Sequence, residues 1–269
     1  MQVVGKMPQK KIFGKALLAV LAASCLALTN FAQKKTVRVA AAADLQAAMP
    51  EIAKAFETQT GTTIDVAYGS SGNFYAQIQN GAPLDAFFSA DNEYPRKLEE
   101  SGFAEPHSST IYGIGKIVLW MPASAKCNPG RDGWQCLQNS VVKKIAIANP
   151  VHAPYGRAAV AALQKAGIYD AVKAKLVLGE NISQAVQFVQ SGNAEAGIIA
   201  SSLTVSAAMQ GGKKWVIPAD LYPRIEQTVV VLKSAKEKLA AQEFIKFVTQ
   251  GPGREILARY GFEPPPPAR

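Results

Sequence analysis

Short apolar runs alternate with amphipathic patterns along the first part of the chain after residue 35. An apolar run at 37–43 precedes apolar positions at helical spacing over 45–56, and Gly61 ends this predicted helix. Two more pairs follow in the same order, with strands at 63–68 and 85–90 and helices at 74–80 and 91–102. Strict alternation predicts an α/β fold with mostly parallel sheets and helices on both faces. Ligands of such sheets bind at the carboxyl ends of the strands.

Residues 111–120 interrupt this alternation with one long extended run that has glycines in its middle. We interpret the run as a crossing from one lobe into another, and a second long strand at 226–232 as the crossing back. The predicted organisation is a signal peptide (1–32), the first part of lobe 1 (33–113), lobe 2 (114–227), and the rest of lobe 1 with a disordered proline-rich tail (228–269). Two lobes joined by two extended hinge crossings predict a ligand site between them.

The N-terminus has the features of a secretory signal. Four lysines precede or enter the apolar run 13–28, and residues 30–32 offer a small-residue cleavage site. No later segment is apolar for long enough to span a bilayer, so we expect export to the periplasm. Cys25 stands in a weak lipoprotein cleavage box, which leaves a lipid anchor as an alternative.

Charge and cysteine usage exclude several partners. The formal charge of +9 falls to +5 without the signal, because that segment holds four lysines and no acids. An arginine-rich stripe is missing, which argues against nucleic acid as a partner.

Cys127 and Cys136 would close the loop 128–135 with a disulfide in an oxidising compartment. Their spacing, with His107 and His152 as the only histidines, does not fit a metal site.

Small hydroxyl residues and glycines stand where a predicted strand leads into a helix at 69–72. The first N–H groups of such a helix have no intrahelical partner and carry partial positive charge, which makes an anion site without lysine or arginine. Ser70 or Ser71 can cap the helix or turn its hydroxyl toward a bound oxygen. The alternative is that Ser71 only caps the helix.

Four strand-to-helix junctions share this character. They lie at 43–45, 69–72, 149–157 and 179–183. Because two belong to each predicted lobe, we expect several helix N-termini to face one point, an arrangement that suits a small dianion.

Five motifs occur in a fixed order along the chain: Ala-Ala-Ala-Asp-Leu at 41–45, Ser-Ser-Gly-Asn at 70–73, Gly-Ala-Pro-Leu-Asp-Ala-Phe-Phe-Ser-Ala-Asp at 81–91, Asn-Pro-Val-His-Ala-Pro-Tyr-Gly at 149–156, and Arg-Tyr-Gly-Phe at 259–262. With them, the chain resembles the periplasmic molybdate-binding proteins of ABC importers, which have the type II solute-binding fold. The resemblance runs from about residue 36 to residue 262. It implies capture of molybdate or tungstate, delivery to a membrane permease, a monomer, no cofactor and no chemistry on the ligand. The only metal implied is that of the bound oxyanion.

The same resemblance implies an oxyanion site. Ser71 matches a serine that gives hydroxyl and amide to the oxyanion, and Tyr155 and Ile182 match positions that offer main-chain amides. Two positions depart from the pattern, since Asp44 stands in place of a serine and Ala200 in place of a tyrosine. The phenol of Tyr155 is a hypothetical replacement for that tyrosine.

Asp44 is the larger departure. Two unit charges about 4 Å apart repel by roughly 4 kcal/mol at an effective dielectric near 20, and a dianion doubles this. Three interpretations stay open. In the first, Asp44 caps its own helix by accepting from the Gln46 or Ala47 amide and offers the ligand only its backbone. In the second, the Asp44 carboxylate bonds the metal centre of the oxyanion, as in archaeal tungstate-binding relatives that the chain resembles at this position. In the third, the pocket is tuned to another ligand.

Other candidates are weaker. Ser70 and Arg157 are additional candidates for ligand contact, although an arginine in this place is more often solvated or paired with a carboxylate. His152 is expected to fix its loop.

Two other functions compete with this interpretation. One is the same fold binding another oxyanion, an organic anion or a metal complex, and the other is a hydrolase. A hydrolase lacks support because no nucleophile-elbow motif occurs.

Overall fold

The computed structural model describes residues 1–3, 5 and 35–265. The predicted signal peptide, with Cys25, lies outside these residues except for 1–3 and 5. The end of the predicted tail, 266–269, lies outside them too. Within the described ranges, no helix has the length and apolar character needed to cross a membrane.

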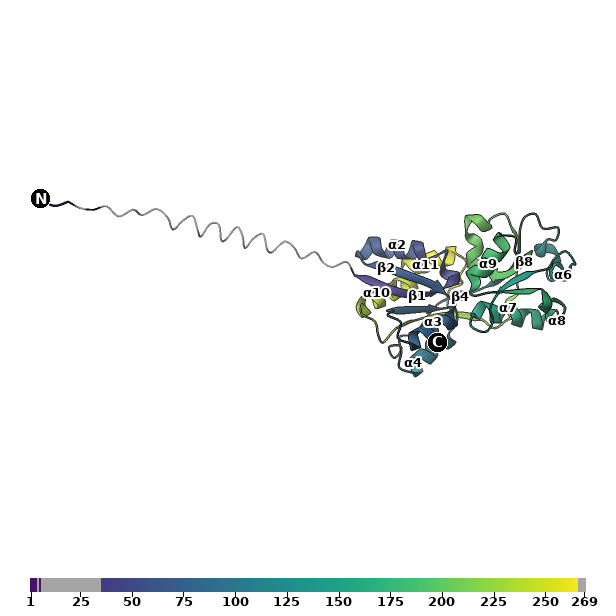
Figure 1. The fold of residues 1–269 in the computed structure, drawn as a ribbon, viewed down its shortest axis with the longest axis horizontal. Coiled ribbons are helices and arrows are strands. Elements are labelled where there is room, and N and C mark those ends of the chain that lie inside the picture. Colours follow the sequence, from purple (N-terminus) through teal and green to yellow (C-terminus); the bar gives the residue numbers. More distant parts are fainter. Residues whose placement is uncertain (4, 6–34, 266–269) are drawn as a thin grey trace. The chain divides into compact units, whose positions relative to one another are not determined.

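The first sheet brings together segments from both ends of the chain (Figure 1). Its strand order is β2-β1-β3-β10-β4, formed by β1 (Thr36–Ala42), β2 (Thr63–Gly69), β3 (Ala86–Ser89), β4 (Thr110–Gly115) and β10 (Ile225–Val231). β1 pairs in parallel with β2 and β3, whereas β10 is antiparallel to β3 and β4. The helices that belong to this part are η1 (Ala43–Leu45), α2 (Met49–Thr60), α3 (Ser71–Gln79), α4 (Glu93–Glu100), α10 (Lys238–Gln250) and α11 (Pro252–Arg259).

The second sheet uses the middle of the chain. Its order is β7-β6-β8-β5-β9, formed by β5 (Ile117–Met121), β6 (Ile145–Ala148), β7 (Leu176–Gly179), β8 (Ala196–Ala200) and β9 (Lys213–Val216). β6 is parallel to β7 and β8, and β5 is antiparallel to β8 and β9. Its helices are α5 (Pro129–Asp132), α6 (Gln135–Gln138), α7 (Pro154–Lys165), α8 (Tyr169–Val172), η2 (Lys173–Lys175), α9 (Ile182–Gln190), η3 (Ser201–Val205), η4 (Ala207–Met209) and η5 (Ala219–Leu221).

The chain passes between the sheets at two places. β4 ends at Gly115 and β5 begins at Ile117, so the predicted run 111–120 is two strands in different sheets. The return lies between β9 and β10, at 217–224. The two-part α/β fold is therefore confirmed. Parallel pairing joins only three strands in each sheet, and the strands next to the crossings make both sheets mixed.

We call the part around the first sheet lobe 1 and the part around the second sheet lobe 2. We propose lobe limits at Lys116 and within 217–224, near the limits 113/114 and 227/228 expected from the sequence. The return precedes the expected limit because Gln227 already pairs with Gly113 in the first sheet.

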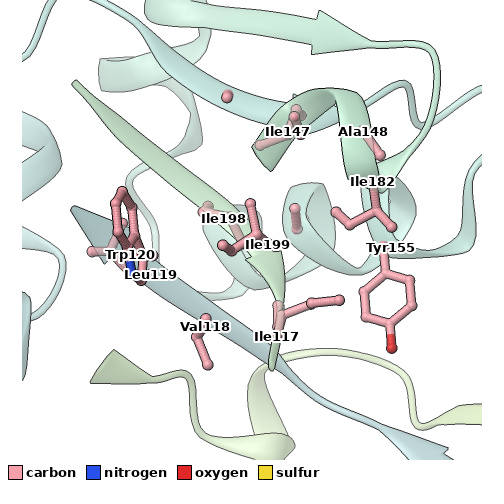
Figure 2. Packing of buried hydrophobic residues seen from close by; sticks show 14 of the residues in the cluster. Ile117, Val118, Leu119, Trp120, Ile147, Ala148, Tyr155, Ile182, Ile198 and Ile199 are labelled. Atoms are coloured by element: carbon pink, nitrogen blue, oxygen red, sulfur yellow. The ribbon is translucent and has the colours of Figure 1, made fainter. Parts of the chain in front are cut away.

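The lobes have cores of different character. Lobe 1 buries an aromatic group in which the Phe56 and Phe244 rings pack edge to face at 5.1 Å, and Phe88 packs on Phe244 at 5.7 Å. Lobe 2 buries aliphatic side chains from its strands, among them Ile198 and Ile199 (Figure 2). Such burial is the main stabilising contribution in each lobe.

The predicted disulfide between Cys127 and Cys136 is confirmed, with the two Cα atoms 5.6 Å apart. It closes a loop of lobe 2 that contains the short helix α5. The Asn128 side chain caps this helix by accepting from the Gly130 N–H at 3.0 Å. The cysteines therefore hold a loop locally.

Candidate functional site

The junction of β2 and α3 buries two adjacent serines that do different things. α3 begins at Ser71, earlier than predicted, so Ser70 is the N-cap and accepts from the Asn73 N–H at 3.4 Å. The Ser71 hydroxyl instead accepts from the Ala90 N–H at 2.9 Å. The alternative that Ser71 only caps the helix is therefore wrong. Because a hydroxyl can accept and donate at once, Ser71 keeps its own hydrogen for another acceptor.

The helices α7 and α9 begin with main-chain N–H groups that the N-cap side chains do not accept from. α7 starts with Pro154, which has no N–H, so Tyr155 carries its first donor. At α9 the Asn181 side chain accepts from the Gln184 N–H at 3.0 Å, two residues beyond Ile182. The first N–H groups of a helix have no acceptor within it. Tyr155 and Ile182 thus lie at helix positions whose main-chain N–H groups have no intrahelical acceptor, and their role as donors to a ligand stays a prediction.

The N-terminus of α3 contacts two loops of lobe 2. The Gly72 N–H donates to the His152 carbonyl oxygen at 2.9 Å, and the Asn73 amide donates to the Glu180 carboxylate. His152 also places Nδ1 2.9 Å from the Ser70 hydroxyl, so it fixes its loop against lobe 1. These contacts join the junction 69–72 to the junctions 149–157 and 179–183.

The 3₁₀ helix η1 contacts the N-termini of α7 and α9. The Tyr155 hydroxyl donates to Asp44 Oδ2 at 3.0 Å, and the Ser183 hydroxyl lies 3.4 Å from the Ala43 carbonyl oxygen. Ser202 of lobe 2 donates to the main-chain oxygen of Asp44 at 2.8 Å. The junction 43–45 is therefore hydrogen-bonded to both junctions of lobe 2. The junction 69–72 is bonded to 149–157, and the adjacent Asn73 is bonded to Glu180, so the four junctions lie together.

Asp44 is fully buried at this convergence. It does not cap a helix, so the interpretation in which it accepts from Gln46 or Ala47 is wrong. Its Oδ2 accepts from the Tyr155 hydroxyl and, at 2.6 Å, from Gln227 Nε2. Its Oδ1 is buried and has no partner among the described residues. Burial raises the pKa of the Asp44 carboxyl to about 7, although the hydrogen bonds from Gln227 and Tyr155 and an interaction with its own main-chain N–H act to lower it.

Gln227 and Tyr112 complete a buried network that sequence reasoning missed. Gln227 Nε2 also donates to the Tyr155 hydroxyl at 2.8 Å, and Gln227 Oε1 accepts from the Tyr112 hydroxyl at 2.5 Å. Burial raises the pKa of both tyrosines well above 10, and the Asp44 charge acts in the same direction. An amide side chain at the second position of the otherwise largely apolar strand 226–232 was a signal for Gln227. Tyr112 gave none, because it matches a core residue.

Arg157 is paired across the lobes. Its guanidinium contacts the Asp91 carboxylate at 2.5 Å and lies over the Tyr94 ring, 5.5 Å from the centroid. The positive charge of Arg157 is thus paired with a carboxylate of lobe 1.

The side chains of Tyr155 and Ile182 belong to the core of lobe 2. Figure 2 shows the Tyr155 hydroxyl pointing away from the labelled aliphatic side chains. That hydroxyl donates to the Asp44 carboxyl of lobe 1, and its contact with a ligand stays a hypothesis. Ala200, which replaces a tyrosine of the expected pattern, is fully buried at the end of β8.

The family pattern described as bacterial extracellular solute-binding protein matches residues 37–263. The chain belongs to this family. The resemblance and the fold expected from the sequence are thereby confirmed, and the family is one of solute-binding proteins, not enzymes.

Two curated relatives cover most of the chain. The molybdate-binding protein ModA of Azotobacter vinelandii is 42% identical over 247 residues, which is 91% of this chain and 96% of that protein. ModA of Rhodobacter capsulatus is 39% identical over 226 residues, 84% of this chain and 87% of that protein. The solved periplasmic molybdate-binding protein of Azotobacter vinelandii superposes with a TM-score of 0.79 at 36% identity, covering 86% of this chain and all of that one.

Proposed function

We propose that this family member captures molybdate or tungstate between its lobes in the periplasm and delivers it to the membrane permease of an ABC importer. The observation that carries the proposal is the convergence of four helix-start junctions, two from each lobe, bonded directly to one another. The names of the two relatives support molybdate as the class of ligand. We expect a monomer without a cofactor, and the alternative of a lipid anchor at Cys25 stays a hypothesis.

The proposed site holds the dianion mainly with neutral donors. The Ser71 hydroxyl and the N–H groups of Ser71, Tyr155 and Ile182 donate to its oxygens, and the helix dipoles favour negative charge at this point. Hydrogen bonds to a charged partner contribute about 1.5–3 kcal/mol each. Arg157 is paired with Asp91 and adds no direct contact in this proposal. Ser70 is engaged as a cap and by His152.

A second candidate is an anion that still carries a hydrogen, such as hydrogen phosphate. The unpartnered Oδ1 of Asp44 favours it, because an ionised carboxylate can accept from such a ligand and repels one without a hydrogen.

Calorimetric titration and thermal shift of the chain without residues 1–32 test these candidates. Molybdate and tungstate should bind, whereas sulfate and phosphate should bind more weakly. A ligand at a hundred times its dissociation constant stabilises by about 2.7 kcal/mol, which is visible as a shift in Tm. The absence of a shift with both molybdate and tungstate would refute the main proposal. Tight phosphate binding would favour the second candidate.

A further inference from the structure

One polar atom at the convergence of the four junctions stands out. Asp44 has no exposed surface, and its Oδ1 has no hydrogen-bond partner among the described residues. Its other oxygen is held by two donors, the Tyr155 hydroxyl and Gln227 Nε2. Buried polar atoms in folded proteins nearly always have partners. An unpartnered buried oxygen on η1, which contacts the N-terminal residues of α7 and α9, therefore points to a ligand atom.

The hydrogens of the network can be assigned. Gln227 gives one amide hydrogen to Asp44 Oδ2 and the other to the Tyr155 oxygen. Tyr155 gives its hydrogen to Asp44 Oδ2, and Tyr112 gives its own to Gln227 Oε1. With two donors already at Oδ2, a proton on the carboxyl group must sit on Oδ1.

Among the residues that the structure describes, no cationic side chain contacts the Asp44 carboxyl. The titratable groups that face it are the phenols of Tyr155 from α7 and Tyr112 from β4. At the rim, Arg157 of α7 is paired with Asp91 at 2.5 Å. The other rim groups, His152 and Glu180, lie 3.8 Å from each other in the loops before α7 and α9. The elements η3 and β10 contribute the neutral side chains of Ser202 and Gln227, and Ser183 is the neutral contact from α9.

We propose that Asp44 binds the oxyanion as a neutral carboxylic acid whose Oδ1–H donates to a ligand oxygen. The inference rests on the proposed function and deepens it. When Asp44 is ionised before binding, capture of the dianion takes up one proton from solvent, and this proton forms the O–H bond at Oδ1. The neutral acid favours oxyanions that only accept hydrogen bonds, because its Oδ1–H is a donor and gives a ligand O–H no free carboxylate oxygen to donate to.

Gln227 and Tyr155 are positioning residues in this proposal. Their donors fix Oδ2 and leave Oδ1 for the ligand. The same donors favour the ionised form, so they oppose the effect of burial on the Asp44 carboxyl. The raised pKa, about 7, means that Asp44 changes charge within the accessible pH range.

The decisive measurement is the Kd for molybdate from about pH 6 to about pH 9, combined with calorimetry in buffers of different ionisation enthalpy. For the wild type, we expect a constant Kd below about pH 7 and up to about tenfold weaker binding per pH unit above it. Proton uptake should rise from near zero at about pH 6 toward one per molybdate at about pH 9.

Asp44→Asn replaces the Oδ1–H donor with an amide hydrogen that does not titrate. Its Kd should vary less than about twofold over the same range, with no proton uptake. As controls, His152→Gln and Glu180→Gln remove the rim groups and should keep the wild-type pH slope. Tyr155→Phe keeps the main-chain N–H and removes one donor to Oδ2, so the pH above which binding weakens should move upward. A merely structural role of Tyr155 would leave that pH unchanged.

The outcomes separate the two proposals. Binding at about pH 6 with a Kd that stays constant to about pH 9 and no proton uptake overturns the role of Asp44 and leaves the proposed function intact. No binding at about pH 6 overturns both. The proton count on the wild type decides the matter even if Asp44→Asn fails to fold.

Discussion

The two lobes contribute to the candidate site in different ways. Of the ten buried polar or charged residues in the described part of the chain, eight lie in lobe 1 and two in lobe 2. Lobe 1 brings functional side chains to the site, namely the Ser71 hydroxyl, the Asp44 carboxyl and the Gln227 amide. Lobe 2 brings the first amides of α7 and α9, on residues whose side chains belong to its apolar core. Ligand selectivity should therefore depend on side chains in lobe 1 and on the main chain in lobe 2.

The largest expected effect concerns the Asp44 carboxyl. Its pKa in the folded protein, about 7, lies above the ordinary value, so its contribution to stability is complete below about pH 4. That contribution falls as pH rises through about 7, by at most about 4 kcal/mol. The free energy of unfolding in urea, compared for wild type and Asp44→Asn from about pH 4 to about pH 8, measures this. Equal pH slopes for the two proteins would contradict the burial of a titrating carboxyl in lobe 1.

The contact between the lobes can be disturbed at Gly72. A Cβ there would lie 2.7 Å from the His152 carbonyl oxygen and 2.7 Å from the Tyr94 hydroxyl. Both distances are too short, so Gly72→Ala should separate α3 from the loop 149–153 and weaken molybdate binding by about 100-fold. Gly113→Ala is the control, because its Cβ would meet Phe262 at an ordinary 3.4 Å. Unchanged affinity in Gly72→Ala would show that this contact is not required.

The neighbouring serines of lobe 1 separate ligand contact from capping. Ser71→Ala removes a donor to the oxyanion and the acceptor of the Ala90 N–H, so affinity should fall about 30-fold and stability by about 1–3 kcal/mol. Ser70→Ala removes the N-cap and should cost about 1 kcal/mol of stability, with affinity changed by less than about threefold. Calorimetric titration and urea unfolding of both variants measure these effects. Equal losses of affinity would mean that Ser71 has no special role.

The smallest expected effect tests whether lobe 2 contributes only main-chain N–H groups to ligand binding. Ile182→Val keeps the main-chain N–H and shortens a buried side chain, so it should cost about 1 kcal/mol of stability. The affinity for molybdate should change by less than about twofold, because the donor is the amide. A loss of tenfold or more, measured by calorimetry, would show that the side chains of lobe 2 also act on the ligand.

Much of this protein was predictable from local patterns. Alternating apolar runs and glycine-terminated helices indicated two α/β parts, and short-range signals such as Ser-Ser-Gly-Asn placed the helix starts within a few residues. The cysteine spacing predicted a local disulfide correctly. The run 111–120 was correctly interpreted as a crossing between the two parts, although the apolar pattern does not show that the run divides at Lys116 into two strands of different sheets.

The role of Asp44 was decided by the tertiary structure alone. Its local sequence indicates a helix cap, whereas in the fold its carboxyl accepts from Gln227, 183 positions away, and from Tyr155 of the other lobe. The sequence by itself determined which segments form strands and helix starts, because those depend on neighbours along the chain. Burial, hydrogen bonding and the resulting pKa of a side chain depend on neighbours in space, which here come from the packing within lobe 1 and from the packing of lobe 2 against it.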